Sequence, residues 1–466
     1  MMAFRSAFTP LLTSAFPTRT TSGTLSLSTF ANSLTEHCTQ TVRQNVSLLD
    51  LCKLPPASAY VHLPFCRKRC HYCDFPIIAL GSSSDHHHDD PRISSYVETL
   101  CREIMATNST PSSCPPLQTV FLGGGTPSLV PPRLVSSVLD ALSSKFGVCG
   151  NAEISMEMDP GTFNAAAMKE LMGLGVNRVS LGVQSFQDEL LKCCGRAHGV
   201  DEIFEAVEIV KSCGVENWSL DLISSLPHQT PAMWEESLHL TIQAQPTHVS
   251  VYDLQVEQDT KFGFLYTPGE FPLPSENQSA ELYKMASRML SNAGYEHYEI
   301  SSYGKTGYRC RHNTTYWKNK PFYAFGLGSA SYIGGVRFSR PRRLREYTNY
   351  VQALENGVAD HTQSEGIVEP KDLAMDVVML SLRTADGLDL KSFREAFGDS
   401  ILLSIFEAYR PYLESGLVIC LDEQRRNVAA DEVMSNEKLA YLRLSDPDGF
   451  LLSNELISVA FAVICP

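Results

Sequence analysis

Short runs of β-branched and apolar residues recur along the chain after residue 60, and a segment with helical spacing follows each of them. The runs cover residues 60–63, 119–122, 153–156, 178–181, 218–223 and 248–252. The segments between them, among them 131–146, 164–175, 200–214 and 231–244, repeat apolar residues at the helical period and end near Gly or Pro. Because strands that alternate with helices pair in parallel through crossover connections, this order predicts an α/β fold. Six or more such units predict a partial or full βα barrel.

The alternation stops past residue 335. Helical spacing returns over residues 372–382, 390–396 and 401–415, and a short hairpin is expected around Val418, Ile419 and Val428. This order predicts a small α+β domain that resembles a winged helix. We therefore expect a βα-barrel domain over residues 55–335, a linker over 336–368 and a C-terminal domain over 369–466.

Charge and hydropathy narrow the class of protein. The 466 residues include 52 Asp and Glu against 38 Lys and Arg, a net charge of −14, and no long basic run that would neutralise phosphates. We therefore expect no nucleic-acid partner. The longest apolar stretch near the C-terminus, residues 456–464, is much shorter than the roughly 20 residues that span a bilayer, so we expect no membrane span. The 14 cysteines are irregularly spaced, which is typical of metal-binding or catalytic thiols in a reducing compartment.

The N-terminal segment has the composition of a targeting sequence. Its first 35 residues contain fourteen Ser and Thr and two arginines, Arg5 and Arg19, and no acidic residue precedes Glu36. Transit peptides share this composition, and no continuous apolar core of a secretory signal is present. We expect residues 1–50 to be a transit peptide for the chloroplast or the mitochondrion. The alternative is an ordinary disordered N-terminus on a protein of the cytoplasm.

The strongest chemical signal is a group of three cysteines directly after the first predicted strand. Cys66, Cys70 and Cys73 have the spacing C-x3-C-x2-C and lie where a βα barrel places its functional groups. Three thiolates at this spacing can hold one face of a 4Fe–4S cube, and the fourth iron then lacks a protein ligand. The alternatives are a structural zinc site with His71 as fourth ligand and an inert trio of cysteines. The basic residues 67–69 would offset the negative charge of a cluster.

The cysteine segment resembles a known family. C-x3-C-x2-C with an aromatic residue before the last cysteine, here Tyr72, is the signature of the radical S-adenosylmethionine (radical SAM) enzymes. The longer string HLPFC-RKR-CHYCDF, residues 62–75, is similar to the oxygen-independent coproporphyrinogen III oxidase-like branch, which includes HemN and HemW. The resemblance implies a barrel of the radical SAM type, a 4Fe–4S cluster on Cys66, Cys70 and Cys73, and S-adenosyl-L-methionine (SAM) on the open iron.

Further residues at the expected strand ends fit a SAM site. The glycine run 123–125 follows the second predicted strand and lets the backbone approach a ligand closely, whereas Glu157 is the type of residue that hydrogen-bonds ribose hydroxyls. The resemblance implies a set of cofactor-binding residues: Tyr60, Tyr72, Gly124, Gly125, Thr126, Glu157, Gln184, Arg196 and Asp221. Each one also has a structural alternative, such as a turn, a surface acid, an ion pair or a cap.

Two features separate the branches of this family. The oxidases carry a fourth cysteine two residues after the third, and this chain has Phe75 there. The HemW-like branch has CDF, here residues 73–75, and a later H-N-x-x-Y-W segment, here residues 312–317. The resemblance therefore implies a haem chaperone that carries haem as cargo to client haemoproteins, with His312 as a haem ligand. The alternatives are a core histidine at this position, and an oxidase that decarboxylates coproporphyrinogen III by radical chemistry.

Overall fold

The computed structural model describes residues 47–81, 90–108, 114–358, 369–429 and 439–465. Residues 1–46 of the predicted leader lie outside the described residues. The described part of that segment begins a short helix, α1 (Leu48–Leu51), and Leu48 and Leu49 pack against the core of the C-terminal part. Residues 47–50 at the end of the expected leader therefore belong to the described fold, and the boundary at residue 50 stays a prediction.

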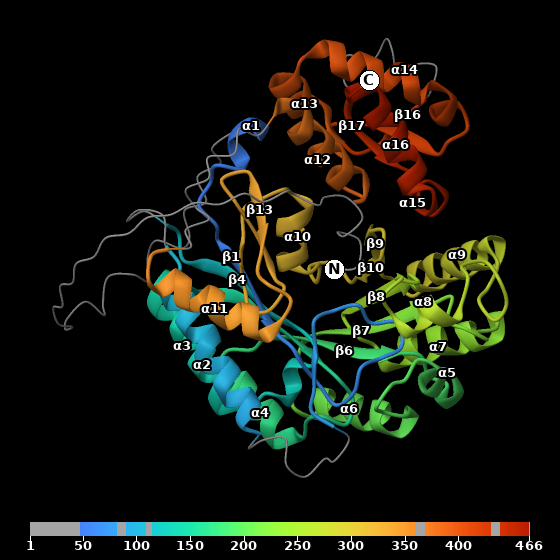
Figure 1. Ribbon diagram of the computed structural model, residues 1–466. Helices are drawn as coiled ribbons and strands as arrows, with labels where there is room; N and C mark the ends of the chain where they lie inside the picture. Colours follow the sequence, from blue (N-terminus) through green and yellow to red (C-terminus); the bar gives the residue numbers. More distant parts are fainter. Residues whose placement is uncertain (1–46, 82–89, 109–113, 359–368, 430–438, 466) are drawn as a thin grey trace.

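A nine-stranded sheet forms the centre of the molecule (Figure 1). All six strands expected from the sequence are present and pair in parallel in chain order. They are β1 (Ser58–Leu63), β4 (Leu117–Gly124), β5 (Val148–Met158), β6 (Arg178–Gln184), β7 (Asn217–Ser224) and β8 (His248–Asp253). β1 is buried along its whole length, as expected for a strand of a parallel sheet that is covered on both faces.

The sheet ends in strands that the sequence analysis did not find. β11 (Tyr323–Phe325) pairs in parallel with β1, and at the other edge β10 (Ser302–Gly304) and β9 (Glu296–Glu299) pair antiparallel beside β8. The order is β11-β1-β4-β5-β6-β7-β8-β10-β9, and no pairing of β9 with β11 closes it among the described residues. Of the two expected forms, the partial barrel is therefore confirmed.

Helices between the strands cover the outer side of the sheet (Figure 1). They are α2 (Pro91–Ala106), α3 (Pro132–Phe146), α4 (Ala165–Gly173), α5 (Asp188–Cys193), α6 (Val200–Ser212), α7 (Pro231–Ala244), α8 (Lys261–Leu265) and α9 (Glu276–Asn292). On α2, the residues Ile93, Val97, Leu100 and Ile104 recur at helical spacing and are buried in the first hydrophobic core. Burial of each such side chain contributes about 1.5–3 kcal/mol.

A second hydrophobic core is built almost entirely from the residues after 370. Its elements are α12 (Pro370–Leu382), β14 (Leu388–Asp389), α13 (Leu390–Phe397), α14 (Asp399–Glu414), β15 (Val418–Asp422), β16 (Asn427–Val428), β17 (Leu439–Leu444), α15 (Asp448–Leu451) and α16 (Ser453–Ile464). The three helices and the hairpin expected here are confirmed, and the four strands have the order β14-β17-β15-β16. Within the described ranges, none of the helices has the length and apolar character needed to cross a membrane.

The expected linker is wrong in its described part. Residues 336–358 contain β13 (Val336–Ser339), which pairs with β12 (Ala330–Ile333), and α11 (Leu344–Glu355). Tyr347 and Val351 lie one helical turn apart on α11 and are buried in the first core, where the Tyr347 hydroxyl donates to Glu103 at 2.7 Å. This apolar face makes the helix part of the first core. The remainder of the expected linker, residues 359–368, lies outside the described residues.

Candidate functional site

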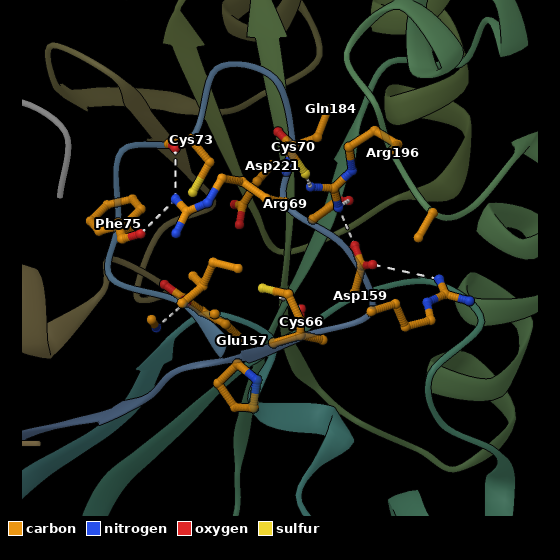
Figure 2. A pocket seen from close by; sticks show the side chains of 18 of the residues that line it. Cys66, Arg69, Cys70, Cys73, Phe75, Glu157, Asp159, Gln184, Arg196 and Asp221 are labelled. Atoms are coloured by element: carbon orange, nitrogen blue, oxygen red, sulfur yellow. Dashed lines mark hydrogen bonds and ion pairs between the residues drawn. The ribbon is translucent and has the colours of Figure 1, made fainter. Parts of the chain in front are cut away.

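The three cysteines line one pocket at the carboxyl ends of the parallel strands (Figure 2). The chain leaves β1 and enters β2 (Phe65–Cys66), which pairs in parallel with β3 (Ile78–Ala79). Cys66 ends β2, and Cys70 and Cys73 lie in the loop between these two short strands. All three are free thiols. The β2–β3 pairing therefore closes a loop that carries three cysteines to one wall of the pocket.

Arginines hold the backbone of this cysteine loop. Arg69 donates to the carbonyls of Cys73 and Phe75 at 3.0 and 2.9 Å. Arg67 donates to the carbonyl of Pro160 at 2.8 Å, and Arg342 donates to the carbonyl of Asp74 at 2.5 Å. Two of the three basic residues expected to offset cluster charge, Arg67 and Arg69, therefore also hold the loop in place.

The geometry does not favour the zinc alternative. His71, the fourth ligand that zinc would need, directs Nδ1 to the carbonyl of Cys193 at 2.7 Å and Nε2 to Nζ of Lys261 at 3.1 Å. Both ring nitrogens of His71 therefore have other partners, and His71 does not join the three sulfurs as a fourth ligand.

These sulfurs fit a cluster held by thiolates. Burial raises the pKa of Cys66 to about 12 and that of Cys73 to about 11, so both thiols are neutral in the protein alone. Two donors reach sulfur atoms: Thr126 Oγ1 lies 3.6 Å from Cys66 Sγ, and Arg196 Nη1 lies 3.3 Å from Cys70 Sγ. Such hydrogen bonds would stabilise thiolates at Cys66 and Cys70 that hold a cluster.

Gly124 and Gly125 of the glycine run line the pocket, but it is the neighbouring protein that leaves no room for a side chain at these positions. At Gly124, which has φ +118°, a Cβ would lie 2.6 Å from the His62 ring, and at Gly125 a Cβ would lie 2.6 Å from the backbone of Pro64 and Phe65. The run therefore packs against the segment that leads into the cysteine loop. A ligand is not needed to explain these glycines, although Gly124, Gly125 and Thr126 all face the pocket.

Glu157 and Asp221 supply carboxylates to the same pocket. Burial raises the pKa of Glu157 to about 7. Burial also raises the pKa of Asp221, which accepts hydrogen bonds from Ser180 at 2.8 Å and Ser219 at 3.1 Å. Asp221 was expected at a strand end but lies inside β7. Its side chain still lines the pocket, because every second side chain along a strand points to the same face of the sheet, and Asp221 lies on the face that borders the pocket.

Gln184 and Arg196 complete the wall on the side of β6. Gln184 ends β6 with φ +68°, a left-handed conformation that turns the chain away from the sheet. Arg196 follows α5 rather than a strand, contrary to expectation, and enters the pocket from that loop. The pocket also includes Tyr60 and Tyr72, so every residue expected to bind the cluster or SAM lies in its lining.

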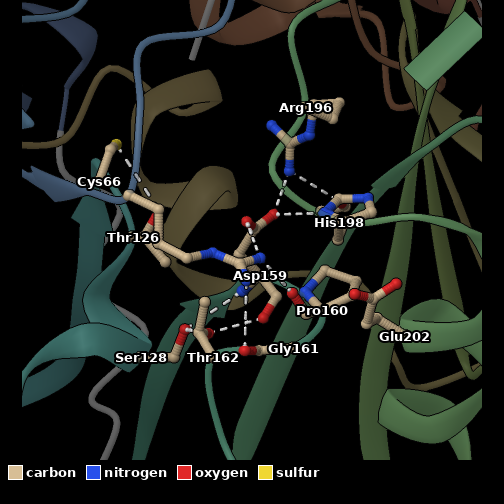
Figure 3. A network of polar contacts seen from close by, with 12 residues as sticks. Cys66, Thr126, Ser128, Asp159, Pro160, Gly161, Thr162, Arg196, His198 and Glu202 are labelled. Carbon is tan, nitrogen blue, oxygen red and sulfur yellow. Dashed lines mark hydrogen bonds and ion pairs between the residues drawn. The ribbon is translucent and has the colours of Figure 1, made fainter. Parts of the chain in front are cut away.

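Asp159 is a pocket residue that the sequence analysis did not assign (Figure 3). It forms ion pairs with Arg196 and, at 3.6 Å, with Arg67, and its Oδ1 lies 3.2 Å from Nδ1 of His198. Burial by itself would raise the pKa of Asp159. Arg196, His198 and Arg67 lower this pKa by more than burial raises it, so it lies below the usual value for an aspartate. The available signal was its position directly after the predicted strand and two residues after Glu157, since residues that follow a parallel strand lie at the carboxyl edge of the sheet.

His312 lies outside the lining of this pocket, on α10 (Arg311–Trp317). Its Nδ1 is 2.7 Å from Oγ1 of Thr119, its Nε2 is 2.7 Å from the hydroxyl of Tyr316, and its ring stacks on Phe121 at 5.2 Å. Burial lowers the pKa of His312 to about 3, so the imidazole is neutral. These contacts are those of a histidine packed in the core, and they favour that alternative over the haem-ligand role. The haem-ligand role of His312 is left to a test by substitution.

The open parallel sheet and the three thiols at its carboxyl edge define a radical SAM protein. Residues 60–241 match the Radical SAM superfamily, and residues 368–428 match the HemN C-terminal domain. The heme chaperone HemW of Synechocystis sp. is 40% identical over 415 residues, which cover 88% of this chain and 98% of the relative. The heme chaperone HemW of Escherichia coli K12 is 36% identical over 332 residues, which cover 71% of this chain and 83% of the relative. This chain belongs to the HemW family.

A solved structure has the same fold. Coproporphyrinogen III oxidase (HemN) of Escherichia coli, a radical SAM enzyme, aligns with a TM-score of 0.68 at 20% sequence identity, over 89% of this chain and 92% of that one. The radical SAM fold brings with it a 4Fe–4S cluster and SAM as cofactors. Cys66, Cys70, Cys73 and Glu157 line the same pocket, and their roles toward these cofactors stay a prediction.

Proposed function

We propose that this protein is a haem chaperone, which binds haem and delivers it to client haemoproteins. The observation that carries the proposal is the 40% identity along 98% of a protein named heme chaperone HemW. A second support is Phe75, which occupies the position where the oxidases of this branch carry a fourth cysteine and which lines the pocket.

Within this proposal, the residues of the pocket have separate tasks. Cys66, Cys70 and Cys73 would hold the cluster, and Glu157 would accept hydrogen bonds from the ribose of SAM. A cluster of this kind, when bound, supplies one-electron reduction of a ligand on its open iron. The glycine run 123–125 keeps the wall close to the cysteine loop, and the ring of Tyr72 and the side chain of Ile223, which belong to one buried hydrophobic cluster, limit the access of water.

The alternative is radical decarboxylation of coproporphyrinogen III. Protein reconstituted with iron and sulfide under anaerobic conditions should be divided between two assays. In one, haem is titrated and the Soret band is followed. In the other, coproporphyrinogen III, SAM and a reductant are added and products are separated by chromatography. We expect saturable haem binding and no decarboxylated product. Robust decarboxylation would contradict the chaperone proposal and support the oxidase.

We also propose that the N-terminal segment directs the protein to an organelle, the chloroplast or the mitochondrion. The support is the composition of residues 1–35, which are rich in Ser and Thr and free of acidic residues. A fusion of residues 1–50 to a fluorescent protein should enter one of these organelles. A variant with Arg5 and Arg19 replaced by Glu is the matched control, because acidic residues oppose import. Cytoplasmic fluorescence of the native fusion would contradict this proposal.

A further inference from the structure

One carboxylate joins three separate segments around the pocket (Figure 3). Asp159 directly follows β5, and its side chain is 14% exposed. Its partners are Arg67 from the cysteine loop, and Arg196 and His198 from the segment between α5 and α6. The backbone next to it takes part as well, because Arg67 also donates to the carbonyl of Pro160 at 2.8 Å.

Arg196 is the partner that reaches the cysteines (Figure 2). Its Nη1 donates to Cys70 Sγ at 3.3 Å and to the Tyr72 hydroxyl at 3.2 Å, and its Nη2 donates to Asp159 and to the carbonyl of Gly182 at 3.0 Å. The side chain is 11% exposed, and its buried Nε makes no hydrogen bond to any of the described residues.

The balance of charge explains why the aspartate matters for this geometry. Arg67 and Arg196 are two cations with 13% and 11% of their side chains exposed, and both face the same carboxylate. Buried charges require compensation by a partner. If Asp159 were neutral, the two guanidinium groups would repel each other with no anion between them, and Arg196 would lose one of the contacts that set its orientation toward Cys70.

We propose that Asp159 is a positioning residue of the cofactor site, which holds the Arg196 guanidinium against Cys70 and Tyr72 and aligns it with bound SAM. The part that concerns SAM rests on the proposed use of this pocket. The part that concerns Cys70 does not, because the contacts of Arg196 with the thiol and with Asp159 are present without any ligand.

The first test uses reconstituted protein without SAM. The midpoint potential of the cluster is measured for the native protein, Asp159→Asn, Arg196→Gln and the double variant, with iron content and thermal unfolding recorded for each. A hydrogen bond and a positive charge next to a ligand sulfur change the reduction potential. If Asp159 acts through Arg196, Asp159→Asn should shift the potential differently in the native and Arg196→Gln backgrounds. Equal shifts in both backgrounds would overturn the proposal, because a distant charge or a general loss of stability acts additively.

The second test uses SAM, followed through its effect on the electron paramagnetic resonance of the reduced cluster. Asp159→Asn should weaken SAM binding at least tenfold at unchanged iron content, and should weaken it no further in the Arg196→Gln background. Asp201→Asn, at an exposed carboxylate in the first turn of α6, is the matched control and should bind SAM as the native protein does. Native SAM affinity in Asp159→Asn would overturn the proposal. Failure of the native protein to bind SAM would instead contradict the assignment of the pocket, and the potentials would still decide the role of Asp159.

A variant that keeps the charge covers the case in which Asp159→Asn does not fold. Asp159→Glu lengthens the side chain by one methylene and displaces the carboxylate from Arg196. It should retain the iron of the native protein and bind SAM several-fold more weakly. Native affinity and native potential in Asp159→Glu would contradict a positioning role.

Discussion

The backbone N–H of Gly124 donates a hydrogen bond of 2.9 Å to Oε2 of Glu157. This contact joins the glycine run at the end of β4 to the carboxylate of β5, so two features that the sequence analysis treated separately form one wall of the pocket. Burial raises the pKa of Glu157, whereas the hydrogen bond from Gly124 lowers it, and the result is about 7. The charge of this wall therefore changes in the neutral pH range.

The raised pKa of Glu157 predicts pH-dependent SAM binding. The ionised carboxylate accepts hydrogen bonds from ribose hydroxyls more strongly than the protonated acid does, and the ionised form is the minor one below pH 7 and the major one above it. Binding should therefore be tighter at pH 8 than at pH 6, by up to about tenfold. Isothermal titration of reconstituted protein across this range measures the effect. Glu157→Gln should bind weakly and lose this dependence, and an equally steep pH profile in the variant would assign the titration to another group.

Removal of the three pocket cysteines should abolish the cluster. The triple variant Cys66→Ala, Cys70→Ala and Cys73→Ala should fall from about four irons per chain to almost none, because each thiolate holds one iron. Iron analysis and the visible absorbance of reconstituted protein measure the loss. The matched triple Cys101→Ala, Cys114→Ala and Cys213→Ala removes thiols outside the pocket and should keep its iron. Retained iron in the first triple would disprove the assignment.

Gly124→Ala should destabilise the protein even without cofactors. The new Cβ would lie 2.6 Å from the His62 ring, and φ of +118° is unfavourable for any L side chain. We expect a loss of about 2 kcal/mol or more in the free energy of unfolding, measured by urea denaturation of the apoprotein. Gly150→Ala is the control: nothing lies within 4 Å of its Cβ position. Similar losses in the two variants would show that the packing against His62 is unimportant.

His312→Ala should lower stability and leave the spectrum of bound haem unchanged. The substitution removes a ring stacked on Phe121 and leaves Thr119 and Tyr316 without their imidazole partner. We expect a loss of about 2–4 kcal/mol in a denaturation experiment. His239→Ala, at an exposed histidine of α7, should change neither stability nor spectrum. A shifted Soret band in His312→Ala would instead establish His312 as a haem ligand, in which case haem binding must break both imidazole hydrogen bonds.

Local patterns in the sequence determined the secondary-structure elements and the cysteine site, because the residues that form each of them lie close together in the chain. The six parallel strands β1, β4, β5, β6, β7 and β8 follow from runs of apolar residues, because a strand buried in a parallel sheet needs side chains that pack on both faces. The cysteine site follows from a spacing within eight residues, since a loop after a strand carries its thiols to the edge where parallel strands end. Even so, the reason for the glycine run was found only in its contact with His62 and Pro64.

Only the tertiary structure decided the features that depend on pairs of distant segments. The pairing of β11 with β1 joins residues more than 260 positions apart, and the antiparallel strands β10 and β9 occupy the other edge, so the sheet stays open. The same holds for α11, which packs in the first core, and for His312, whose partner Thr119 lies 193 residues away. Asp159 gains its role from Arg67 and Arg196, which come from different loops. A single sequence records the residue types at such positions, whereas their partners are set by the packing of the whole chain.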